Sequence, residues 1–167
     1  MPMFSKRVCQ TLHDEHLATS RLLERLGALL DRCRQEPPDG TDGLVTQLLR
    51  DIQSAMESEI TRHFNFEEAQ LFGYLARIGE AAIGAHLTEE HEAMRPLGRE
   101  LGAFARAAAA GGFDARSWQA FQRVAAELCD RLLGHIHKEE MALLPLLEDN
   151  LDPAADASLH EAYAVNG

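Results

Sequence analysis

The chain has 167 residues, enough for one domain with a hydrophobic core and few for two. Its 16 lysines and arginines stand against 27 aspartates and glutamates, a formal net charge of −11, which argues against a nucleic-acid partner and against binding to anionic lipid. No segment has the ~18 uninterrupted apolar residues of a membrane span, and the amino end lacks the apolar stretch of a secretory signal. We therefore expect a single cytoplasmic domain over residues 1–167, with its three cysteines reduced.

Helix-forming residues dominate the composition, and no segment alternates with the period of a strand. Glycine, proline and asparagine breaks divide the chain into four predicted helices. These helices are expected at residues 5–35, 42–78, 81–110 and 115–149. The tail, residues 150–167, is expected to add a short helix in which Leu159, Tyr163 and Val165 fold back on the rest.

Each predicted helix carries an apolar stripe at alternating steps of three and four residues, and ionisable residues interrupt every stripe at about the same depth. The interrupting residues are His16 in the first helix, His63 and Glu67 in the second, His91 in the third, and His135 and Glu139 in the fourth. Four such helices with short connections predict an all-α fold, an antiparallel up-down-up-down four-helix bundle with its core at about residues 8–149. Because a buried unpaired charge costs several kcal/mol, these residues need a shared partner.

An internal repeat strengthens this interpretation. The segment HFNFEE, which begins at His63, is matched by HIHKEE, which begins at His135, and each places a glutamate four residues after the histidine. Four residues advance an α-helix by roughly 400°, so each histidine–glutamate pair points the same way. His16 and His91 repeat with a similar offset, 75 residues against 72. Two helical hairpins related by a pseudo-twofold axis would bring six donors together, which suits two metal ions bridged by two carboxylates.

Other candidates fit less well. His86 and Glu90 form a third pair with the same spacing, but His86 lies off the apolar stripe, and we interpret this pair as a surface contact. Glu68 and Glu140 follow their histidines by five residues, which turns them about 140° away, so we interpret them as solvated or as acceptors behind the ligands. Whether either one ligates directly stays open. His13 is expected at the rim of the site, and a polar core layer without metal is the remaining alternative.

The motifs together resemble the hemerythrin-like HHE cation-binding family. The residues that carry the resemblance are Glu15-His16, His63-x-x-x-Glu67-Glu68, Glu90-His91 and His135-x-x-x-Glu139-Glu140. The resemblance covers about residues 8–149 and implies a non-haem di-iron centre, bridged by carboxylates and by an oxo or hydroxo group. One departure is informative, because Leu87 stands where oxygen-carrying hemerythrins have a fifth histidine.

The leading hypothesis is a di-iron protein that binds or reacts with a small ligand such as oxygen, nitric oxide or peroxide. The alternative is an iron sensor, or an iron donor for iron-centre repair, whose fold responds to metal occupancy. A third hypothesis is a metal-free interaction bundle. Imidazole and carboxylate donors also accept manganese or zinc. No base or nucleophile outside the ligand set stands out, so the sequence decides neither enzymatic activity nor whether two copies form a homodimer.

Overall fold

The computed structural model describes residues 1–165, apart from the side chain of Glu59, and every regular element in this part is helical. Asn166 and Gly167, which end the predicted tail, lie outside the described residues. The helices are α1 (Arg7–Arg32), α2 (Gly43–Ser54), α3 (Ile60–Phe66), α4 (Phe72–Arg77), α5 (Ala81–Gly111), α6 (Ala115–Lys138), α7 (Leu144–Asn150) and α8 (Pro153–Val165). The all-α prediction is confirmed. No helix in this part of the chain is both long and apolar enough to cross a membrane.

Several of these helices continue into one another through π-helical turns, so the chain forms four long helical stretches and one short one within residues 1–165. The π-helical turns are Ala55–Glu59 between α2 and α3, Glu67–Leu71 between α3 and α4, and Glu139–Leu143 between α6 and α7. Each of them closes with a backbone hydrogen bond across five residues, as from the Phe72 N–H to the Glu67 carbonyl. Such turns are rare and often accompany functional sites. Two of the three begin at a predicted ligand.

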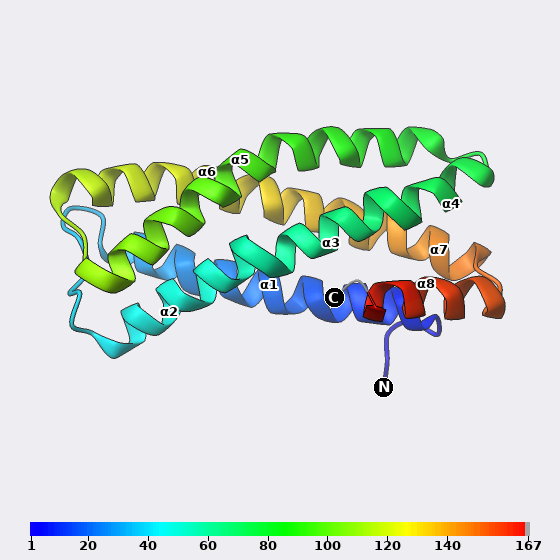
Figure 1. Cartoon of the computed structure of the whole chain (residues 1–167), viewed down its shortest axis with the longest axis horizontal. Coiled ribbons are helices and arrows are strands. Elements are labelled where there is room, and N and C mark those ends of the chain that lie inside the picture. The colour runs from blue at the N-terminus through cyan, green and yellow to red at the C-terminus, as the bar shows by residue number, and fades with distance from the viewer. Residues whose placement is uncertain (166–167) are drawn as a thin grey trace.

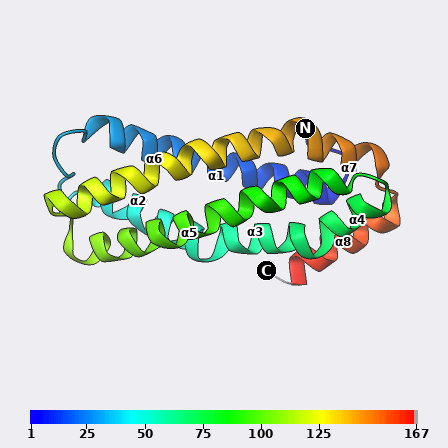
Figure 2. The same ribbon diagram turned by 90° about the horizontal axis from the view of Figure 1, so that it is seen from above.

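The four long stretches lie side by side, and the chain turns back at each connection (Figures 1 and 2). α5 packs against α2 and α6, while α1 packs against α6 and α8. Local signals set the ends of these helices. Asp42 accepts a hydrogen bond from the Leu44 N–H at the start of α2, and Asp114 with Ser117 forms a capping box at α6. Gly79, at φ +88°, makes the tight turn between α4 and α5.

The short helix α8 is the predicted tail helix, and it folds back along α1 (Figure 1). Leu159 and Tyr163 are buried as expected. The expectation for Val165 was wrong, because its side chain is 77% exposed at the last turn of the helix. Asp156 of α8 is also buried, and its carboxylate accepts hydrogen bonds from the backbone N–H groups of Arg7 and Val8, which begin α1.

Two hydrophobic clusters form the core, and a polar layer separates them. One cluster surrounds Trp118, Phe121 and Leu101, towards the end that holds α2 and the start of α6. The other surrounds Leu12, Leu75 and Leu144, towards the end that holds α4, α7 and α8. His16 and His91 lie between the two clusters in sequence. Leu12 and Leu23, on either side of His16, belong to different clusters, and so do Leu87 and Met94, on either side of His91.

Candidate metal centre

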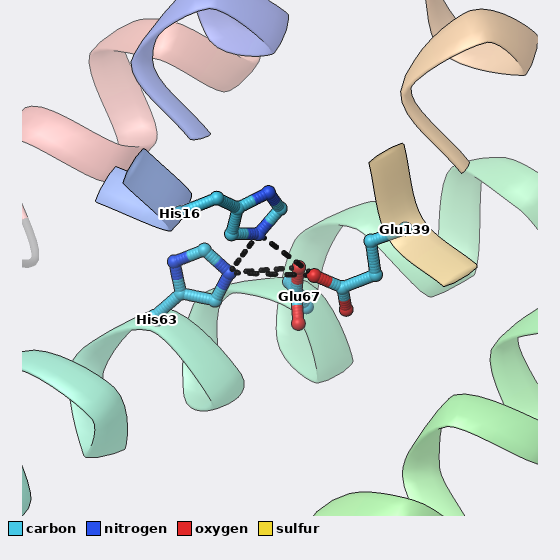
Figure 3. Close-up of side chains that lie close together, drawn as sticks. All are labelled: His16, His63, Glu67 and Glu139. Carbon is cyan, nitrogen blue, oxygen red and sulfur yellow. Dashed lines mark hydrogen bonds and ion pairs between the residues drawn. The ribbon is translucent and has the colours of Figure 1, made fainter. Parts of the chain in front are cut away.

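All six side chains named from the sequence as candidate ligands meet in this polar layer, and none is more than 8% exposed. They come from all four long helical stretches: His16 from α1, His63 from α3, His91 from α5, His135 from α6, and Glu67 and Glu139 from the first residues of two π-helical turns. Their donor atoms form two groups, each with all atoms within 4.8 Å of one another. His16 and His63 belong to one group, and His91 and His135 to the other. Glu67 and Glu139 belong to both (Figure 3 shows the first group).

The two shared carboxylates each turn one oxygen to each histidine pair. Glu67 Oε1 lies 3.1 Å from His63 Nε2, and Glu67 Oε2 lies 3.2 Å from His91 Nε2. Glu139 Oε2 lies 2.8 Å from His16 Nε2, and Glu139 Oε1 lies 2.8 Å from His135 Nε2. This is the arrangement of a carboxylate that bridges two ions.

These residues fit metal ions because their buried oxygens and nitrogens lack other partners. The four carboxylate oxygens of Glu67 and Glu139 are buried and have no hydrogen-bond donor in acceptable geometry. A buried charged group without a partner is expensive, so a cation is the natural complement. The imidazoles agree, because His16 Nε2 and His63 Nε2 are only 3.3 Å apart, and the Nε2 atoms of His91 and His135 are 3.0 Å apart. Two nitrogen lone pairs this close need a proton or a metal ion between them.

Behind the centre, each of these four candidate ligands donates its Nδ1–H to a further glutamate. The four distances are 2.5 Å from His16 to Glu140, 2.8 Å from His63 to Glu15, 2.8 Å from His91 to Glu68, and 2.7 Å from His135 to Glu90. A carboxylate only accepts, so this hydrogen bond places the ring proton on Nδ1 and leaves the Nε2 lone pair directed at the centre. Such partners orient ligating histidines and raise their basicity.

These outer glutamates follow the internal repeat. Glu15 and Glu90 each serve the histidine of the next helix in the same hairpin, His63 and His135. Glu68 and Glu140 reach across to the other hairpin. The interpretation of Glu68 and Glu140 as acceptors behind the ligands agrees with this geometry. The sequence analysis paired Glu90 with His86 and therefore missed its hydrogen bond to His135. The repeated Glu-His dipeptides at 15–16 and 90–91 were the signal that could have revealed it.

The surrounding carboxylates favour positive charge at the imidazoles. Burial lowers the pKa of His63, but the charge of Glu67 and the contacts with Glu139 and Glu15 outweigh it and hold that pKa well above its ordinary value. The pKa values of His16 and His135 are raised in the same way, against the effect of burial, chiefly by Glu139. The pKa of Glu139 itself lies well below its usual range, since the three imidazoles outweigh its burial. Protons and metal ions therefore compete for the donor atoms of this cluster.

The four histidines of the centre differ in access. A cavity of about 210 Å³ reaches the centre, where its wall includes His16, His63, His135 and Glu139. On the other side, the Phe64 ring stacks on the His91 ring at 3.8 Å between centroids and 11° between planes. Phe72 stacks against the same imidazole at 5.9 Å. A small molecule can therefore approach His16, His63 and His135, while aromatic rings cover His91.

Of the four remaining histidines, His13 and His86 lie where the sequence analysis placed them. His13 is at the rim, where its Nδ1 lies 2.9 Å from Glu140 Oε2. His86 is on the surface, with 57% of its side chain exposed, 3.3 Å from Glu90. His137 is exposed as well. None of these three belongs to either group of donor atoms.

An all-helical protein with buried histidines and glutamates in this arrangement is a metal-binding protein whose donors fit two ions. Comparison with protein families agrees: the chain matches the Hemerythrin HHE cation binding domain over residues 8–147, with a second match over residues 85–165. The chain belongs to this family. The second match begins in α5, where the second hairpin of the internal repeat begins. No curated protein matches the chain at a significant level.

Proposed function

We propose that this protein is a non-haem di-iron protein that binds, or reacts with, a small ligand such as oxygen, nitric oxide or peroxide. One observation carries the proposal: two histidine pairs share two buried glutamates whose four oxygens have no hydrogen-bond donor. The proposal includes an antiparallel up-down-up-down order for the four long helical stretches, so that each contributes one histidine from a position near mid-length.

In this proposal, His16 and His63 would hold the first ion, and His91 and His135 would hold the second. Glu67 and Glu139 would serve both ions. Two neutral nitrogens and two carboxylate oxygens per ion suit iron, and they also accept manganese or zinc. The Nδ1–H bonds to the outer glutamates fix the rings before any ion arrives, which lowers the cost of assembling the site.

An iron pair supplies redox chemistry and exchangeable coordination positions. The protein controls how a ligand reaches these positions. The cavity beside His16 and His63 admits a molecule of a few atoms, and its wall includes the apolar side chains of Ile60, Leu132 and Ile136. Phe64 covers His91 by stacking on its ring. We therefore propose that the exogenous ligand binds on the His16–His63 side.

Anaerobic titration with ferrous iron tests this proposal. We expect two equivalents per chain and, after oxidation, a visible absorption that shifts when azide is added. His63→Ala should lose the shift, and His137→Ala, a matched change at an exposed position, should keep it. The di-iron proposal fails if the protein takes up no iron, or if His63→Ala binds as much iron as the parent.

The alternative function is an iron sensor or donor, and the burial of the donors favours it. The six ligand residues come from all four long helical stretches and lie in the core, so metal occupancy and folding are coupled. A sensor would lose much of its helicity or protease resistance on chelation while giving no spectral response to azide or nitric oxide. A ligand-binding protein would give that response.

A further inference from the structure

The four outer glutamates are held in place by different partners. Arg95 donates to Glu68, with contacts of 2.9 and 3.1 Å. Lys138 bonds Glu90, and His13 lies against Glu140. Glu15 is distinct, because one of its partners comes from the tail helix: Arg62 lies at 2.9 Å from Oε1, and the phenol of Tyr163 bonds Oε2. Tyr163 belongs to α8, while every other such partner belongs to the four long helical stretches.

Tyr163 is buried and packed within this site. Its side chain is 4% exposed, and its ring packs on Phe66 at 4.6 Å between centroids. The guanidinium of Arg62 lies 4.9 Å from the centre of the same ring. The hydroxyl donates to Glu15 Oε2, which is also the atom that accepts the Nδ1–H of His63 at 2.8 Å. A single carboxylate oxygen thus joins the tip of α8 to a candidate metal ligand.

The rest of α8 is anchored independently. Asp156 accepts hydrogen bonds from the backbone of Arg7 and Val8 at 3.0 Å, and Leu159 packs in the cluster at that end of the core. Tyr163 follows Asp156 by seven residues, about two helical turns, so both face α1. Loss of the Tyr163 hydroxyl should therefore release the end of α8 without unfolding its beginning.

We propose that Tyr163 is a positioning residue for His63, acting through Glu15, and that it links the docking of the end of α8 to metal retention beside the cavity. Without the phenol, Glu15 Oε2 keeps only His63 as a partner, and the carboxylate can turn towards Arg62 or solvent. The His63 ring then loses its fixed direction. Because coupling free energies are reciprocal, a metal ion on His63 also stabilises the docked end of α8. This inference rests on the proposed metal site.

The test compares Tyr163→Phe with Tyr74→Phe. The chain has two tyrosines, and Tyr74 of α4 offers a matched control because its hydroxyl donates to the carbonyl of Asn150, the last residue of α7. Ferrous iron retention is measured against a competing chelator under anaerobic conditions, and hydrogen exchange of residues 153–165 is measured with and without iron. Thermal unfolding of each metal-free variant reports any general loss of stability.

We expect Tyr163→Phe to weaken iron retention about tenfold, the low end of the range for loss of an outer partner of a metal ligand. Iron should slow exchange at the end of α8 in the parent and in Tyr74→Phe, and this effect should disappear in Tyr163→Phe. Unchanged retention and unchanged iron-dependent protection would overturn the inference, as would a lower unfolding temperature alone. A parent protein that binds no iron would instead refute the proposed function.

Discussion

Metal removal should lower the free energy of unfolding of this protein. The six proposed ligands are at most 8% exposed and come from four separate helical stretches, so the unfolded chain cannot assemble them. An ion that binds only the folded state adds about 2.7 kcal/mol at a concentration of 100 times its Kd. Two ions add about 5 kcal/mol, and for a domain of this size each kcal/mol moves the Tm by about 2–4 °C. Chelation should therefore lower the Tm by about 10–20 °C.

Thermal unfolding followed by circular dichroism measures this difference on protein loaded with iron and on the same protein after chelation. His63→Ala should lose most of the difference, because one proposed ligand of the first ion is gone. His137→Ala should keep it, since that side chain is exposed. A chelator that lowers the Tm of the parent no more than that of His63→Ala would show that metal binding at this site does not stabilise the fold.

Three further predictions concern the same centre. Glu139→Gln should abolish loading of both ions, as measured by elemental analysis, because one Glu139 oxygen faces each histidine pair. Glu140→Gln should weaken the metal affinity by only about 10–100-fold. Equal losses in the two variants would count against bridging by Glu139. Thr19→Phe should fill the cavity and slow azide binding, measured by stopped flow, at unchanged iron content. Thr61→Phe, in a groove that no histidine lines, should leave the rate of azide binding unchanged. Equal rates in the two variants would exclude the cavity as the route. The Tm gained on loading with iron should grow as pH rises from about 6.5, the ordinary histidine pKa. The raised histidine pKa values stabilise the metal-free fold at low pH, and this stability is lost as pH rises through them, while the metal ions meet less competition from protons. A gain independent of pH would contradict this proton competition.

Helical periodicity was enough to predict most of the fold. The predicted third helix, 81–110, differs from α5 by one residue, because Gly79 and Gly112 leave few alternatives at its ends. The first helix is shorter than predicted, at Arg7–Arg32, since its amino-terminal N–H groups need Asp156 of α8 as an acceptor. A cap that lies 149 residues away in the chain cannot be read from local sequence.

The six candidate ligands could be named from the sequence because each breaks an apolar stripe at the same depth, and the structure brings their donor atoms together. Two features could not be predicted. The π-helical turns that begin at Glu67 and Glu139 share no clear local sequence signature. Pro145 follows the turn at Glu139 by two residues, but no proline stands at the same place after the turn at Glu67. The link from Tyr163 to Glu15 depends on how α8 packs, which periodicity does not specify.

The central claim is that two ions share Glu67 and Glu139. Anomalous diffraction at the iron edge from crystals of the iron-loaded protein tests it most directly, because this measurement counts the ions and places them. We expect two peaks per chain, one between His16 and His63 and one between His91 and His135, each within bonding distance of both glutamates. A single peak, or peaks away from these four histidines, would contradict it.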